Sequence, residues 1–188
     1  KDIKNFAGMK FTINQHINPA AAMLTLTEAT GTKELDWRTL EVDTQSTLGV
    51  PTKSYEAYTQ KLMENTHGLA FEKNSVDTYA DIGLREIKND GKFEYTLDTD
   101  THSANAKRVD LVGYQYKDNR TATYRVSDGS HQEAWGGRTV LGNTVENNQL
   151  TVDGGQLTKG AYGGFVENHK RVHGTPLTTG DAVNNTVL

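Results

Sequence analysis

The 188-residue sequence contains no cysteine, which excludes disulfide bonds, thiol catalysis and thiolate metal sites together. It also lacks any run approaching the roughly 20 apolar residues that a membrane-spanning helix needs. Apolar residues make up only 35% of the chain, and the mean hydropathy is -0.67. Such a polar composition is ordinary for a repeat protein with a narrow interior, and a loop-rich β domain has similar values.

An excess of basic charge is missing as well. The chain has 20 basic and 24 acidic residues, so its formal net charge is -4. No basic face emerges to attract a phosphate backbone, and nucleic acid is therefore excluded as an expected partner. The N-terminal residues 1–4 lack the apolar segment of a signal peptide, the chain begins without Met, and it stops within the apolar run 186–188. We expect an excised piece of a longer protein, without membrane contacts of its own.

What the sequence does contain is a repeat in its last third. An aromatic residue followed by two glycines occurs twice, in Ala134-Trp135-Gly136-Gly137-Arg138-Thr139 and, 27 positions later, in Ala161-Tyr162-Gly163-Gly164-Phe165-Val166. The segment 142–152 is echoed by 180–188, with Asn-Asn pairs 37 positions apart. A polar insertion at about 168–178 accounts for the ten extra residues.

A short β-branched run closed by Gly or Asn, recurring at this period, predicts stacked β coils. Val, Leu and Thr would fill a narrow core, Asn side chains would form ladders between coils, and Gly would make the corners. Eleven of the 18 glycines lie between Gly129 and Gly180. We therefore expect two domains, 1–127 and 128–188, the second made of solenoid coils with an exposed backbone edge at its end.

Residues 1–127 show strand and hairpin patterns. Apolar alternation or strand-forming residues predict strands in 9–13, 23–27 and 35–42, with a turn at 14–19 and a possible bulge between Trp37 and Leu40. Two hairpins are predicted, one from 80–88 and 93–98 around Asp90-Gly91, the other from 108–117 and 120–126 around Asp118-Asn119. Residues 54–66 are ambiguous, because Tyr55, Tyr58, Leu62 and Met63 follow the spacing of a short amphipathic helix.

The residues Tyr162-Gly163-Gly164-Phe165, followed by Gly180-Asp181-Ala182-Val183-Asn184-Asn185-Thr186-Val187-Leu188, resemble the repeats of passenger domains from Gram-negative autotransporters. The segment 147–155 is similar to the same unit. In the N-terminal part, 22–32 and 65–69 also look like such proteins, in which a β-rich segment is interposed between coils. Trp135 with Arg138, in place of the usual aromatic pair, departs from the pattern. The resemblance favours a strand at 59–63 and a turn at 65–68.

The resemblance implies an all-β fold, with parallel β-helix coils in the C-terminal part and an antiparallel, hairpin-rich segment before them. It implies an adhesive or structural part of a bacterial cell-surface or secreted protein, outside the outer membrane. The expected partner is a host or bacterial surface protein or glycan, bound through loops and the lateral face, without cofactor or catalysis. Two alternatives stay open: a β-helical polysaccharide-active enzyme, glycoside hydrolase or lyase, and a plain β sandwich whose repeats are accidental.

Several residue groups are candidates for chemistry. His169 and His173 have the four-residue spacing of a helical zinc site, but the intervening Lys170 and Arg171, without a Glu, favour a surface contact loop. Residues 98–102 alternate oxygen donors as a calcium loop does, but lack its Gly and distal Glu. Asp128, Ser130 and His131 hold triad residue types without a Gly-x-Ser-x-Gly elbow. We expect no metal, cofactor or catalytic residue.

Two further groups connect to the alternatives. Glu133, Asp153 and Asp181 are the carboxylates that a polysaccharide-cleaving enzyme would use, although corner polarity explains them equally. Trp135, Tyr162 and Phe165 predict an aromatic row, which would bind carbohydrate rings if exposed and fill the core if buried. The predicted contact residues are therefore His169, Lys170, Arg171, His173, Trp135 and Tyr162. The Gly-Gly pairs at 136, 154 and 163 are predicted to be backbone corners.

Overall fold

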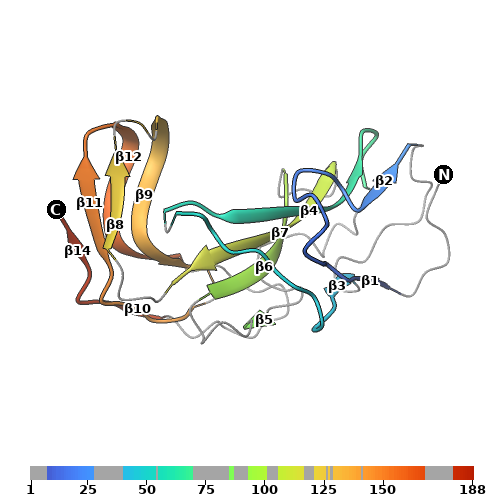
Figure 1. The fold of residues 1–188 in the computed structure, drawn as a ribbon, viewed down its shortest axis with the longest axis horizontal. Helices are drawn as coiled ribbons and strands as arrows, with labels where there is room; N and C mark the ends of the chain where they lie inside the picture. The colour runs from blue at the N-terminus through green and yellow to red at the C-terminus, as the bar shows by residue number, and fades with distance from the viewer. Residues whose placement is uncertain are drawn as a thin grey trace.

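The fold is all-β throughout the part of the chain that the structure describes. The computed structural model describes residues 8–27, 40–53, 55–69, 85–86, 93–100, 106–116, 121–125, 127, 129–140, 142–167 and 180–188. These residues form fourteen strands, with no α-helix among them. None of them builds a helix with the length and hydropathy needed to cross a bilayer. The strands gather in an elongated molecule, with β1 and β14 toward opposite ends (Figure 1).

A five-stranded sheet forms the middle of the molecule. Its order is β2 (Leu24–Leu26), β4 (Tyr58–Asn65), β7 (Arg108–Gln115), β6 (Phe93–Thr99) and β5 (Arg85–Glu86). All neighbours are antiparallel except β2 and β4, which run parallel. The antiparallel pairing of β5 with β6 confirms the first predicted hairpin, whose turn at 87–92 lies outside the described residues.

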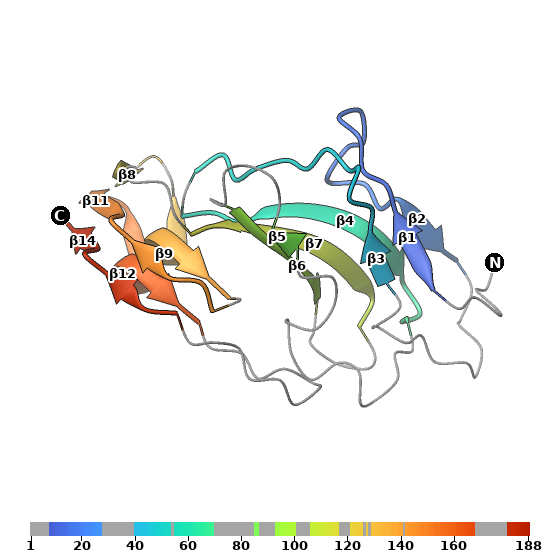
Figure 2. The same cartoon turned by 90° about the horizontal axis from the view of Figure 1, so that it is seen from below.

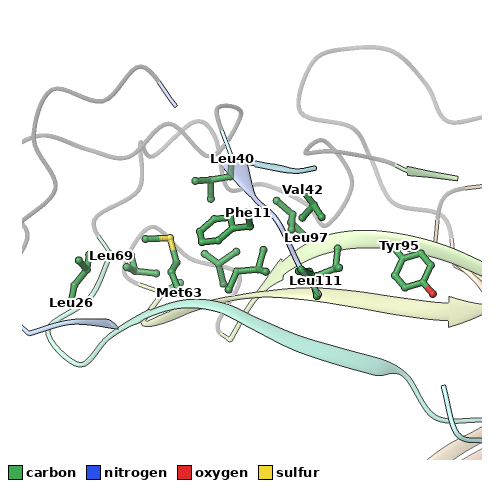
Figure 3. Packing of buried hydrophobic residues seen from close by; sticks show 13 residues of the cluster. Phe11, Leu26, Leu40, Val42, Met63, Leu69, Tyr95, Leu97 and Leu111 are labelled. Atoms are coloured by element: carbon green, nitrogen blue, oxygen red, sulfur yellow. The ribbon is translucent and has the colours of Figure 1, made fainter. Parts of the chain in front are cut away.

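The sheet is curved, and a parallel pair of short strands packs over it (Figure 2). β1 (Met9–Phe11) and β3 (Leu40–Val42) form this pair, with Met9 opposite Leu40. Phe11 and Leu40 point toward Met63, Leu97 and Leu111 of the sheet (Figure 3). The predicted strands at 9–13, 23–27 and 35–42 are each confirmed in part, and a hydrogen bond from the Ile17 amide to the Asn14 carbonyl confirms the turn. Residues 35–39, including the expected bulge, lie outside the described range.

The structure decides between the two interpretations of residues 54–66, because the described residues 55–66 contain a strand and no helix. Residues 58–65 form β4, which lies between β2 and β7, and the Gly68 amide closes the following turn on the Asn65 carbonyl at 2.9 Å. The strand reading favoured by the resemblance is confirmed. Leu62 and Met63 are adjacent yet fully buried because the register shifts between Lys61 and Met63. That bulge produces spacing that mimics a helix.

The second predicted hairpin is also wrong. β7 pairs with β4 and β6, whereas β8 (Thr121–Arg125) pairs in parallel with β11 (Gln149–Asp153). β7 already has a partner on both edges and offers no free edge to β8, and the expected turn at Asp118-Asn119 lies outside the described residues.

The C-terminal strands form parallel stacks in two successive layers. The first layer contains β8, β9 (Ser130–Thr139) and β10 (Val145–Glu146); the second contains β11, β12 (Gln156–Val166) and β13 (Ala182–Val183). β11 lies between β8 and β14 (Thr186–Val187), β12 pairs with β9, and β13 pairs with β10. β8 lies before the expected boundary at 127/128, and that boundary stays a prediction.

The register of these stacks matches the sequence repeat. Ala134 lies opposite Ala161 and Trp135 opposite Tyr162, an offset of 27. Val145 lies opposite Ala182, an offset of 37. The difference, 37 − 27 = 10, is the number of residues attributed to the insertion at 168–178, which itself lies outside the described residues.

Two of the three Gly-Gly pairs are not corners. Gly136-Gly137 and Gly163-Gly164 lie inside β9 and β12, without positive φ. A Cβ atom added at Gly136 would lie 2.5 Å from the Gly163 carbonyl oxygen and 3.1 Å from the Asn148 Cβ. At Gly163 it would lie 2.5 Å from the Thr186 amide nitrogen. These glycines therefore permit close backbone contact across a narrow interior, a use that the corner prediction missed.

The third pair and the Asn-Asn pairs do form corners. Gly154 and Gly155 have φ values of 82° and 86°, and Asn147 and Asn184 have 57° and 52°. The second Asn of each pair forms the predicted ladder, since the Asn185 Oδ1 accepts from the Asn148 amide at 3.0 Å and from its Nδ2 at 3.1 Å. Each Asn-Asn pair thus supplies one turn residue and one ladder residue.

A buried carboxylate joins the sheet to the stack. Glu94 of β6 is fully buried, and its oxygens accept from the Val140 amide at 2.5 Å, the Thr139 hydroxyl at 2.7 Å and the Asn143 Nδ2 at 2.8 Å. Val112 and Tyr114 of β7 pack with Trp135 and Val140 beside it. These hydrogen bonds and packing contacts hold β9 against the sheet.

At the far side of the stack, β12, β13 and β14 are the last strands in their sheets among the described residues. Val183, Val187 and Leu188 are exposed there, the last to 65%. Each of these strands thus has a described neighbour on one edge only.

Candidate ligand-binding site

A pocket of about 460 Å³ lies where the segment before β4 meets β9. Tyr55, Glu56 and Ala57 line one side, and residues of β9 line the other: His131, Gln132, Glu133, Trp135 and Arg138. Its volume is within the range of pockets that bind small ligands.

Tyr55 anchors the first side of the pocket. Its ring is buried and packs edge-on against Tyr124 at 5.3 Å and His131 at 6.2 Å between ring centroids. The Glu56 amide donates to the Lys53 carbonyl at 3.0 Å, which turns the chain just after Tyr55. Tyr124 is held in turn, because its hydroxyl lies 2.5 Å from the Gly129 carbonyl oxygen. The wall is therefore attached to the first layer of the stack.

Arg138 anchors the second side. Its guanidinium carbon lies 4.6 Å from the centre of the Trp135 ring, 4.9 Å from that of Tyr114 and 5.3 Å from that of Phe165. Its Nη2 donates to the Glu167 carboxylate, and only 13% of the side chain is exposed. An arginine surrounded by aromatic rings and paired with a carboxylate is held in one orientation.

Two buried donors of this wall have no hydrogen-bond partner among the described residues. They are the Trp135 Nε1 and the Arg138 Nε. Leaving a buried donor unsatisfied costs about 1–3 kcal/mol, and neither nitrogen is open to solvent in this arrangement. The two belong to side chains that touch each other and both line the pocket.

Of the predicted contact residues that the structure describes, Trp135 lines this pocket and Tyr162 does not. Tyr162 lies opposite Trp135 in the neighbouring strand and packs on Phe165 at 4.9 Å, outside the pocket lining. Trp135 is 7% exposed, and Tyr162 and Phe165 are half-buried, so the aromatic row is mainly packing. His169, Lys170, Arg171 and His173 lie outside the described residues.

The three carboxylates named for the enzyme alternative do not line one pocket. Glu133 lines the pocket just described, and Asp153 forms an exposed ion pair with Arg125 at 3.6 Å. Asp181 is exposed just before β13. The second carboxylate of the pocket is Glu56, which the sequence analysis did not consider.

The calcium and triad candidates take structural positions where they are described. The Asp100 Oδ1 accepts from the Lys107 and Arg108 amides, and the Asp98 Oδ1 lies 2.7 Å from the Thr99 amide. Thr101, His102 and Asp128 are outside the described range. Across the described segments, no group of three His, Cys, Asp or Glu residues is arranged to hold a metal ion.

Sequence reasoning missed Tyr55, Glu56 and Arg138 as pocket residues. Tyr55 and Glu56 were hidden by the helical reading of their segment. Arg138 stands where the second copy has Phe165, and the Glu167 carboxylate two residues beyond Phe165 is its partner. The sequence did contain a signal for Arg138. It is a charged residue where the other copy of the repeat has an aromatic residue, and Glu167, of opposite charge, lies near the matching position.

Comparisons with protein-family models, with curated proteins and with solved structures gave no match to this chain.

Proposed function

We propose that this chain is an adhesive and structural segment of a bacterial cell-surface protein, in which β8 to β14 are successive coils of a parallel β-solenoid. Its coils would serve as a rigid support, and its loops and lateral face would bind a surface protein or glycan. The resemblance to autotransporter passenger repeats motivates this proposal. The extracellular location and the absence of catalysis belong to it as well.

The observation that carries the proposal is the agreement between repeat and register. The aromatic-Gly-Gly units pair at the offset of 27, and the Asn-Asn units at 37. Equivalent glycines also have equivalent neighbours, since Gly136 approaches Asn148 in the first copy and Gly163 approaches Asn185 in the second. An accidental repeat in a β sandwich has no reason to produce equivalent contacts in neighbouring parallel strands.

The same offsets define a test. Val166 and Ala182 have 15 residues between them, whereas their partners Thr139 and Val145 have 5. Deleting residues 169–178 removes ten, leaves the same 5-residue connection in both layers, and removes the predicted contact residues His169, Lys170, Arg171 and His173. If the layers are coils, we expect the shortened chain to keep the far-UV circular dichroism spectrum and urea midpoint of the full chain.

Binding is measured with the labelled full chain on epithelial cells and on Gram-negative bacterial cells. We expect saturable binding of the full chain to at least one of them, and a loss of roughly tenfold or more in the deletion variant. Lys159→Ala, which removes an exposed cation from β12, is the matched control and should bind normally. Absence of saturable binding to both cell types would reject adhesion, and unfolding of the deletion variant would reject the coil arrangement.

A further inference from the structure

We infer that Arg138 is a positioning residue for the contact residues of the insertion at 168–178, because it fixes Glu167, the residue just before the insertion, on the first layer of the stack. Arg138 touches no partner in this role and acts through Glu167. The inference deepens the proposed adhesive function and rests on it. Its evidence lies at the two ends of the insertion, Glu167 and Gly180, which both belong to the described residues.

The first end is held by both the backbone and the side chain of Glu167. Its amide donates to the Thr139 carbonyl at 2.9 Å, and its carboxylate accepts from the Arg138 Nη2. Only 28% of the Glu167 side chain and 13% of the Arg138 side chain are exposed. An ion pair with so little exposure is screened less than a surface pair, so it restrains the chain at the start of the insertion.

Arg138 suits this role because its own position is fixed. Its guanidinium carbon lies 4.6 Å from the centre of the Trp135 ring and 4.9 Å from that of Tyr114. The matching residue in the second copy of the repeat is Phe165. An aromatic residue in place of Arg138 would continue the packing but could not pair with a carboxylate. The charge at this position therefore serves Glu167.

The second end is attached to the same first-layer connection. A Cβ atom added at Gly180 would overlap the Asn143 carbonyl oxygen, so only glycine fits there. The Asp181 carbonyl accepts from the Val145 amide at 2.9 Å. Asn143 in turn donates through its Nδ2 to the buried Glu94 carboxylate at 2.8 Å. Both ends of the insertion are thus tied to one connection, which is itself tied to the central sheet.

Fixed ends favour binding. A segment whose ends are free must be ordered when it meets a partner, and that ordering weakens the affinity. With both ends attached, part of the ordering is present before the partner arrives. The first end depends on a charged pair, so the isosteric change Glu167→Gln releases it while the shape of the side chain stays the same.

Limited digestion with trypsin tests the attachment directly. Lys170 and Arg171 are the trypsin sites of the insertion, and the rate of cleavage in a folded protein reports local opening of the chain. Lys159 of β12 is the internal reference, because cleavage there reports opening of the stack. We expect Glu167→Gln to raise the cleavage rate at the two insertion sites, relative to that at Lys159, at least threefold.

Asp153→Asn is the matched control. It removes, by the same kind of change, the carboxylate of the exposed pair between Arg125 and Asp153, and it should leave the cleavage ratio unchanged. Arg138→Phe installs the residue of the second copy and should raise the ratio as Glu167→Gln does. The double variant should raise it no further, because both changes act through one pair.

Binding to epithelial cells and to Gram-negative bacterial cells tests the positioning role. On the cells that bind the labelled full chain, we expect Glu167→Gln to bind about fivefold more weakly while keeping the far-UV circular dichroism spectrum of the parent. Asp153→Asn should bind as the parent does.

Three outcomes would overturn the inference, and they differ in what they leave standing. If the cleavage ratio does not rise in Glu167→Gln, or rises equally in Asp153→Asn, the ion pair does not hold the insertion. If the ratio rises but binding is unchanged, the pair fixes the first end without positioning the contact residues, and adhesion stands. If the full chain binds neither type of cell, adhesion fails and the positioning role fails with it.

Discussion

The two ends of the molecule both use parallel strand pairs, but they fill the space beneath them differently. At the N-terminal end β1 pairs with β3 at an offset of 31 and β2 with β4 at 39, over a core of thirteen buried apolar residues among those described. At the C-terminal end the offsets are 26 to 28 and 37, and the corresponding interior cluster holds four of the described residues: Tyr55, Tyr124, Ala134 and Leu150. Only the second end carries a sequence repeat.

This difference explains where a parallel arrangement becomes visible in sequence. A wide core accepts many apolar combinations, so neighbouring strands need no common pattern. In a narrow interior the choice of residue is restricted. A Cβ atom added at Gly136 would lie too close to Asn148 and to the Gly163 carbonyl oxygen, so only glycine fits at that position. The constraint then recurs in every layer, and the sequence repeats.

The largest effect that separates the two ends is expected from Leu97→Ala. Leu97 is almost fully buried in the wide core shown in Figure 3. Its loss should lower the free energy of unfolding by about 2–5 kcal/mol, through lost burial and the cavity left behind. Urea unfolding followed by circular dichroism measures this value. A loss below that of Gly136→Ala would mean that the wide core is not the main source of stability.

A smaller but more specific effect is expected from Gly136→Ala. The added methyl group meets backbone atoms of Gly163 and Gln149, which cannot rotate away, so we expect a loss of about 1–3 kcal/mol. Gly160→Ala on β12 is the matched control, because the nearest atoms there belong to the Tyr162 side chain at 3.0 Å or more. Equal urea midpoints for the two variants would contradict a close approach between Gly136 and the backbone of Gly163 and Gln149.

The smallest effect is expected at the corner residue Asn147. Its φ of 57° is costly for alanine and costless for glycine, so Asn147→Ala should lose about 1 kcal/mol while Asn147→Gly should stay near the parent. The pair of midpoints in one urea series isolates the backbone contribution. If both variants lose the same amount, the Asn147 side chain rather than its conformation stabilises the corner.

The sequence predicted the C-terminal pairing well, because Gly, Asn and aromatic residues mark fixed places in each layer. It predicted the middle sheet less well. The Lys61–Met63 bulge imitated helical spacing, and the turn-like Asp118-Asn119 gave no sign that β7 was already paired on both edges. Turn residues report local conformation and not the identity of the partner strand.

The pocket was the least predictable feature. Its two sides come from Tyr55–Ala57 and from β9, about 75 residues apart in sequence, and they are brought together by tertiary packing such as that of Tyr55 on Tyr124 and His131. Trp135 was recognised as a candidate because of its place in the repeat. Glu133 was recognised as a carboxylate, but its neighbour Glu56 had no pattern to mark it.

The change of offset from 27 to 37 has a consequence for engineering. Ten additional residues enter between Val166 and Ala182, yet the strands before and after that point keep in-register neighbours. Length at this connection is thus independent of strand alignment. We therefore expect foreign peptides of differing size to be tolerated there, with the parallel strands acting as a display scaffold.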